Sequence, residues 1–143
     1  MTQTSTLTDQ RSVVRRLIEA SVLGDQEVVG AIVTDDVAGW SPTINVHSRD
    51  ELLAEFDDRH DAFTSVQVTV NRMDASRDRV AAEWRMSARF TGPLEIEDFT
   101  IPPTGGTVHL AGATFADLRG DRVSAFRHYF DDAALLEQLL ALE

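Results

Sequence analysis

The last third of the chain contains two alternating segments around a tight turn, and this pattern restricts the fold more than any other. Residues 107–118 and 122–131 flank Arg119-Gly120-Asp121, an arrangement typical of an antiparallel β-hairpin. The apolar sequence that follows, AALLEQLL, predicts a short terminal helix. The chain therefore ends in two paired strands and a helix that begins where the second strand stops.

Three polar side chains at every second position of the second segment form the main candidate site. Arg127, Tyr129 and Asp131 project from one face, because side chains alternate between the two faces of a strand. If that face lines an apolar pocket, Asp131 is a candidate general acid/base. The alternative is that Asp131 caps the terminal helix, a position that Asp132 could equally fill.

The first third of the chain predicts a long helix followed by a short one. The long helix starts at Thr8 or Asp9 and ends at Gly24, and Asp25 then caps the short helix. The apolar residues of both helices recur at the i, i+3, i+4 spacing of one helix face. These residues are Val13, Val14, Leu17, Ile18, Val22, Val28, Val29, Ile32 and Val33.

The middle of the chain predicts one more helix and three strands. Ser48 or Asp50 caps the helix, which ends near His60. Residues 35–42 form a short strand, and residues 63–73 and 80–90 form longer ones with period-2 alternation. We expect residues 92–106, which hold three of the four prolines, to form a loop.

This order of elements predicts an α+β protein with a single domain over residues 1–143. A cone-like curved antiparallel sheet should pack on the N-terminal helices, enclose a pocket and carry a short C-terminal helix. The last strand has apolar residues on both faces: Val123, Ala125 and Tyr129 on one, Phe126 and Phe130 on the other. We therefore expect a second copy of the chain to cover the sheet's other face.

The net charge of −11 argues against nucleic acid and anionic membranes as partners, because both bind basic surfaces. The chain has no Cys, which excludes disulfides and thiolate metal sites. No pair of its four histidines has a metal-ligand spacing such as H-x-x-x-H, so we expect no metal. The start MTQTSTLTDQ lacks the features of a signal peptide, and no apolar run is long enough to span a membrane. A cytoplasmic location is the expectation.

Three segments of the C-terminal part carry a family pattern: TIPPTG at residues 100–105, LRGDRV at 118–123 and YFDDAALL at 129–136. They resemble the SnoaL-like branch of the nuclear-transport-factor-2-like superfamily, whose relatives include polyketide cyclases, ketosteroid isomerase and limonene-epoxide hydrolase. The resemblance implies a cone-shaped fold with a deep pocket, often a homodimer, and acid/base chemistry without a cofactor. Asp131 matches the Asp that cyclases and the epoxide hydrolase use.

The chain departs from this pattern on the strand at residues 80–90. Phe90 stands where many members have the His of a GTHTG motif. The Arg-x-Asp pair of the epoxide hydrolase is absent, because Arg85 is followed two positions later by Ser87. The alternating face with Glu83, Arg85 and Arg89 is either a polar pocket wall or a solvated surface.

The remaining candidate residues depend on the register of the hairpin. With Gly120-Asp121 at the turn centre, His128 lies opposite Ala113 and His109 opposite Asp132, both facing away from Asp131. A one-residue bulge would instead bring His109 beside Asp131, where the cyclases use a His–Asp pair. We expect Trp40, Trp84, Phe90 and Arg127 to contact substrate; core packing for the tryptophans and an ion pair for Arg127 are the alternatives.

The sequence thus predicts a cofactor-independent acid/base enzyme, a cyclase, isomerase or hydratase/hydrolase, that acts on a small apolar polyketide- or terpenoid-like molecule. Asp131 would transfer the proton, while Tyr129 and His109 would stabilise a developing enolate. The alternative is a non-catalytic module of the same fold that binds a small ligand or dimerises.

Overall fold

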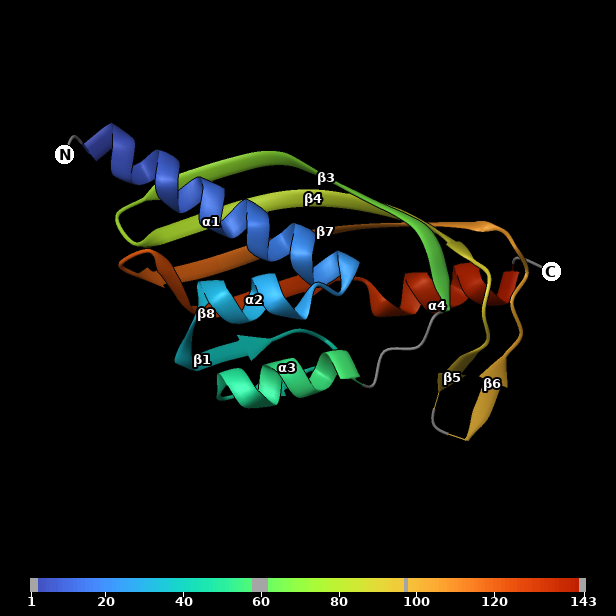
Figure 1. Ribbon diagram of the computed structural model, residues 1–143. Coiled ribbons are helices and arrows are strands. Elements are labelled where there is room, and N and C mark those ends of the chain that lie inside the picture. The colour runs from blue at the N-terminus through green and yellow to red at the C-terminus, as the bar shows by residue number, and fades with distance from the viewer. Residues whose placement is uncertain (1–2, 58–61, 97, 142–143) are drawn as a thin grey trace.

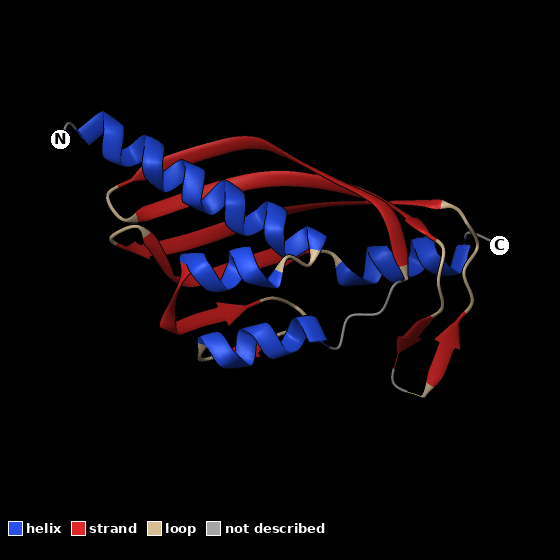
Figure 2. Cartoon of the chain, viewed as in Figure 1, coloured by secondary structure: helices blue, strands red, loops and turns tan. Residues whose placement is uncertain are grey.

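The computed structural model describes residues 3–57, 62–96 and 98–141, and their elements follow the predicted order (Figures 1 and 2). Helices precede the long strands, and a short helix ends the chain. The elements are α1 (Gln3–Leu23), α2 (Gln26–Ile32), β1 (Val33–Trp40), β2 (Asn45–Val46), α3 (Arg49–Asp57), β3 (Phe63–Ser76), β4 (Arg79–Phe90), β5 (Leu94–Ile96), β6 (Phe99–Ile101), β7 (Thr107–Arg119), β8 (Arg122–Phe130) and α4 (Asp132–Ala141).

The six-stranded sheet has the order β2-β1-β8-β7-β4-β3, and α1, α2 and α3 lie together on one of its faces (Figure 1). This arrangement confirms the α+β class. The sheet is mixed and not purely antiparallel as predicted, because β1 pairs with β8 in parallel. Pairing between strands so distant in the sequence leaves no local signal, so the sequence could not reveal it.

Local signals set most of the helix ends. Gly24 adopts a φ of +76°, which suits the end of α1, and the Asp25 carboxylate accepts a hydrogen bond of 3.2 Å from the Val28 N–H. Ser48, and not Asp50, caps α3, since its hydroxyl accepts from the Glu51 N–H at 3.1 Å. The helix α1 begins at Gln3, earlier than predicted. The predicted end of the third helix near His60 lies outside the described residues.

The segment 92–106 is more ordered than the expected loop. The strands β5 and β6 pair within it as a separate antiparallel ribbon, with Leu94 opposite Ile101 (Figure 2). Ile101 is buried in a small apolar cluster with Phe90 and Val108, so this ribbon is fixed to the end of the sheet.

The β7–β8 hairpin contains a bulge that decides which side chains face the helices. Gly120-Asp121 forms the turn as predicted, but Ser124 is an extra residue between the pairs Leu118–Val123 and Asp117–Ala125. Every later pair is displaced by one position, so His128 lies opposite Thr114 and not opposite Ala113. The predicted position of His109 opposite Asp132 is wrong because β8 ends at Phe130, opposite Gly112, and Asp132 is the first residue of α4.

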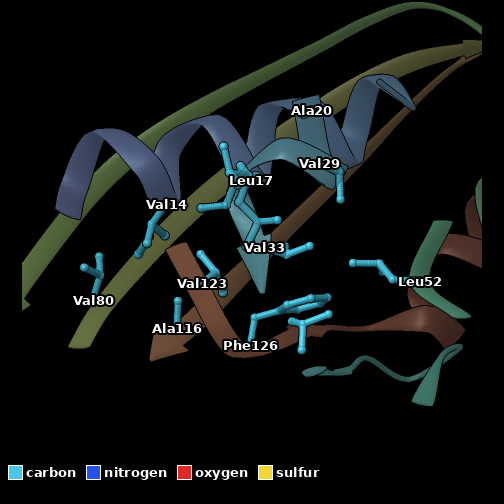
Figure 3. Close-up of a cluster of buried hydrophobic side chains, with 14 of the residues drawn as sticks. Val14, Leu17, Ala20, Val29, Val33, Leu52, Val80, Ala116, Val123 and Phe126 are labelled. Atoms are coloured by element: carbon cyan, nitrogen blue, oxygen red, sulfur yellow. The ribbon is translucent and has the colours of Figure 1, made fainter. Parts of the chain in front are cut away.

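The face of the sheet covered by helices, here the inner face, carries the main core (Figure 3). Val14 and Leu17 of α1 pack there against strand residues such as Val123 and Phe126. On β4, β7 and β8 the inner face consists of Val80, Ala82, Trp84, Met86, Ala88, Phe90, Val108, Leu110, Gly112, Thr114, Ala116, Leu118, Val123, Phe126, His128 and Phe130. The opposite face of the sheet is the outer face.

Candidate functional site

Three polar side chains from adjacent strands form a hydrogen-bonded chain on the inner face. The indole N–H of Trp84 on β4 donates to Oγ1 of Thr114 on β7 at 3.0 Å. The same oxygen lies 2.6 Å from Nδ1 of His128 on β8. Thr114 is 0% exposed, so its hydroxyl group is isolated from water. A hydrogen bond in such surroundings is stronger than one at the surface.

Gly112 allows Trp84 to adopt this position. The two residues are directly paired across β4 and β7, and a Cβ on Gly112 would lie 2.3 Å from Cζ2 of the indole. The indole therefore covers the Gly112 backbone, with Nε1 near Thr114 two positions along β7. A glycine inside an alternating strand often marks such a close approach, and this signal was available in the sequence.

Aromatic side chains lie beside His128 on the inner face. Its ring centroid lies 4.7 Å from that of Phe126, and the Trp84 and Phe130 centroids are 6.4 Å apart. His128 is the one titratable side chain on the inner faces of β4, β7 and β8, three strands that the structure describes completely. Histidine is the residue whose ordinary pKa lies closest to neutral pH, so this position suits proton transfer.

Burial along the inner face changes from one end of the sheet to the other. Near the β7–β8 turn, Val80, Ala116 and Val123 are buried beneath α1. Toward the opposite end, which we call the wide half, Met86, His128 and Phe130 are only half-buried, but Phe90 and Val108 at its far end are fully buried again. The half-buried side chains therefore lie between two buried clusters of the inner face.

Asp131 has the capping role that the sequence left as its alternative. Its carboxylate accepts a hydrogen bond of 2.9 Å from the Ala134 N–H, and its carbonyl accepts one of 3.2 Å from the Leu135 N–H. Asp132 is the first residue of α4. The side chain of Asp131 is exposed. The structure thus shows the cap, and the predicted catalytic role of Asp131 stays a prediction.

Tyr129 and Arg127 lie on the outer face, not with the helices. Tyr129 contacts the rings of Trp40 and Phe115 at centroid distances of 5.1 and 5.8 Å. These three aromatic side chains, Tyr129, Trp40 and Phe115, are 45%, 38% and 43% exposed, respectively. We call them the outer aromatic cluster. Arg127 is exposed, pairs with Phe115 across the hairpin and lines a shallow depression of about 440 Å³.

The predicted site residues therefore divide between the two faces. Trp84 and Phe90 lie on the inner face. Phe90 is fully buried, and its ring centroid lies 5.7 Å from that of Phe63. The outer face carries Trp40, Arg127, Tyr129 and His109. Tyr129 borders a shallow depression of about 410 Å³ on that face. Sequence analysis placed His128 on the face opposite Tyr129, as the structure shows, but did not include it among the predicted site residues.

No group of His, Asp or Glu residues that could hold a metal ion occurs among the described residues. No helix in the part of the chain that the structure describes is long and apolar enough to cross a membrane.

The fold and this site define an α+β protein whose curved sheet holds one histidine among apolar side chains on the face beneath its helices. The profile of the SnoaL-like polyketide cyclase family matches residues 11–139, and the chain belongs to that family. No match is found among curated proteins.

Solved structures with the same fold have low sequence identity to this chain. A candidate SnoaL-like polyketide cyclase from Jannaschia sp. CCS1 has a TM-score of 0.80 at 19% identity, over 99% of this chain and 98% of the other. AclR, a candidate hydroxylase from Streptomyces galilaeus, has a TM-score of 0.75 at 20% identity, over 96% and 99%. An LEH-like epoxide hydrolase from M. tuberculosis has a TM-score of 0.70 at 16% identity, over 94% and 91%. Such identities establish the fold and not the reaction.

Proposed function

We propose that this chain is a cofactor-independent acid/base enzyme of the cyclase or isomerase type. It acts on a small apolar polyketide- or terpenoid-like molecule bound at the wide half of the inner face, and His128 is the proton-transferring residue. The observation that carries the proposal is the contact of 2.6 Å between Thr114 Oγ1 and His128 Nδ1 among apolar side chains. The fixed ring is oriented before any substrate arrives, which is what electrostatic catalysis requires.

The chemistry of such reactions fits a single half-buried histidine beside apolar side chains. Aldol cyclisation and double-bond isomerisation both begin when a carbon next to a carbonyl loses a proton and charge develops on the carbonyl oxygen. An imidazole accepts that proton from the carbon and then returns it, to another carbon in an isomerisation or to the new alkoxide in an aldol cyclisation. Half-buried Met86 and Phe130 supply apolar contacts for the substrate and reduce access of water.

Membership of a polyketide cyclase family supports the class of reaction, and the solved relatives support the fold. The assignment to His128 replaces the one to Asp131 because the Asp131 carboxylate is exposed and bonded to the first turn of α4. An exposed carboxylate is a weak base near neutral pH.

The test is proton exchange at the carbon next to a ketone, measured by NMR for 2-tetralone in D₂O with purified protein. Wild-type protein should accelerate deuterium uptake, and His128→Ala should lose about 100-fold of that acceleration. Asp131→Asn is the matched variant, and it should retain the acceleration. Loss of exchange in Asp131→Asn but not in His128→Ala would overturn the assignment in favour of Asp131. Binding of 2-tetralone without exchange would favour the non-catalytic alternative.

We also propose that the protein forms a homodimer through its outer face. The outer aromatic cluster is exposed in the single chain, and the residues beside it, Ala111 and Ala113, line the shallow outer depression of about 410 Å³. Glu83 and Arg85 lie next to these alanines across the β4–β7 ladder, so a two-fold-related copy could pair opposite charges.

Light scattering after size exclusion tests the dimer. Wild-type protein should have twice the mass of one chain, and Tyr129→Glu should shift it to the monomer because it buries a charge in the contact. Glu27→Lys, an exposed change on α2, is the control. A monomeric wild type would contradict the proposed dimer and would leave the catalytic proposal unaffected.

A further inference from the structure

We infer that Met86 on β4 and Leu135 on α4 limit the length of the apolar ligand that binds at the wide half of the inner face. Each side chain contacts the end of the ligand, so a smaller residue at either position should admit a longer molecule. The inference rests on the proposed function, because it concerns the same site, and it adds two specificity-determining residues.

The partly exposed positions of the inner face form one continuous strip. On β4, β7 and β8, which lie wholly within the described residues, the inner-face positions that are not buried are Met86, Gly112, His128 and Phe130. Phe130 lies opposite Gly112, and Gly112 lies opposite Trp84, two positions before Met86. An apolar ligand that covers this strip therefore contacts Phe130 at one end and Met86 at the other.

The strip ends where the second buried cluster begins. The next inner-face residues of β4 after Met86 are Ala88 and Phe90, and both are buried in that smaller cluster. Among the half-buried apolar side chains that the structure describes, Met86 and Leu135 are the two that pack against both clusters. They approach this boundary from different elements, a strand and a helix. A ligand longer than the strip would have to displace one of them.

The bonds that hold α4 fix the position of Leu135. Its N–H donates to the Asp131 carbonyl at 3.2 Å, and the Asp131 carboxylate caps the same turn. Leu139, one turn later, is buried in the smaller cluster. Leu135 is therefore the more rigid limit. Met86 is unbranched and has more rotatable bonds, so it adapts more easily to the shape of a ligand.

The contact at Met86 can be observed directly, because the chain has three methionines. In protein labelled with ¹³C at the methionine methyl groups, 2-acetylnaphthalene should shift the Met86 signal, which Met86→Leu identifies. Met73 is the internal control, because it is also half-buried but packs against the main cluster alone. Binding of the ketone, measured by calorimetry, without a shift of the Met86 signal would overturn the inference.

Calorimetry with 2-acetylnaphthalene and its longer 6-propyl derivative tests the size limit. Wild type should bind the shorter ketone more tightly, and Leu135→Ala should improve the relative affinity for the longer one by about tenfold. Met86→Ala should act in the same direction but more weakly, since Met86 already adapts. Leu136→Ala is the matched control: it removes the same atoms from the next residue of α4, which packs against the smaller cluster alone. Equal changes in Leu135→Ala and Leu136→Ala would overturn the inference.

The remaining outcomes separate the size limit from the proposed function. Circular dichroism shows whether each variant is folded, and Leu135→Val, with a smaller expected change, replaces Leu135→Ala if the latter is not. If both ketones bind but neither Leu135 nor Met86 affects the preference, the inference fails and the proposed function stands. If the preference follows these residues but no deuterium exchange occurs, the size limit stands and the proposed catalysis fails. If neither ketone binds to wild type, both fail.

Discussion

The side-chain amide of Gln138 continues the β-ladder at His109. Its Nε2 donates to the His109 carbonyl at 2.7 Å, and its Oε1 accepts from the His109 N–H at 2.8 Å. The strand β8 ends at Phe130, opposite Gly112, so the main chain of His109 lies beyond the last strand pair. A primary amide has the same donor and acceptor as a peptide group, and Gln138 therefore joins α4 to the sheet.

Replacing Gln138 should weaken the connection between α4 and the sheet. In Gln138→Leu two main-chain groups of His109 lose their partners, and we expect a loss of about 1–3 kcal/mol in the free energy of unfolding. The measurement is urea denaturation, with amide exchange at His109 as a local probe. Glu137→Leu changes the exposed neighbour on the same helix and is the control. Equal stability of the two variants would contradict the role of the amide.

Gly112→Ala should disturb the site through packing. The added Cβ would lie 2.3 Å from Trp84 Cζ2, so the indole must move and its bond to Thr114 must weaken. Overpacking of this kind costs about 1–3 kcal/mol. Urea denaturation measures the loss. Gly112→Ala should cost less stability when it is added to Trp84→Leu than when it is made in wild type. Unchanged Trp84 fluorescence and stability in Gly112→Ala would show that the indole does not cover this glycine.

Two substitutions of Asp131 distinguish the helix-capping role of its side chain from the effect of its charge. Asp131→Ala removes the acceptor for the Ala134 N–H and should cost about 1 kcal/mol of stability, whereas Asp131→Asn should cost a few tenths at most, because Asn caps helices as well as Asp does. Thermal unfolding of both variants gives the comparison. If Asp131→Asn is destabilised as much as Asp131→Ala, the carboxylate charge and not the cap is what matters.

Much of the fold could be predicted because its signals are local. Period-2 alternation marks the strands, and Gly24, Asp25 and Ser48 mark helix ends by their backbone preferences. The parallel pairing of β1 with β8 depends on contacts between distant segments. No periodicity within either strand records that pairing.

The site was harder to predict because it depends on one residue of register. The bulge at Ser124 places Thr114 and His128 opposite each other, and any residue can form such a bulge. Sequence analysis identified Arg127 and Tyr129 as sharing one face, but the choice of that face as the pocket side rested on its polar residues. The inner face instead holds the apolar residues and His128, since burial beneath the helices decides which face is enclosed.

The ion pair between Asp36 and Arg119 should make stability depend on pH in the acid range. The Arg119 guanidinium donates to both carboxylate oxygens, at 3.1 and 3.4 Å, and it holds the pKa of Asp36 below its ordinary value. A carboxyl group whose pKa is lowered by folding stabilises the protein above its unfolded pKa, and this contribution is lost as the pH falls through the lower, folded pKa. The urea midpoint of wild type should therefore exceed that of Asp36→Asn near pH 7, and the difference should shrink below about pH 4. Both side chains are exposed, so the difference should be small and should also shrink in high salt. Asp121→Asn, in the adjacent hairpin turn, is the control, and a difference that grows as the pH falls would contradict the assignment.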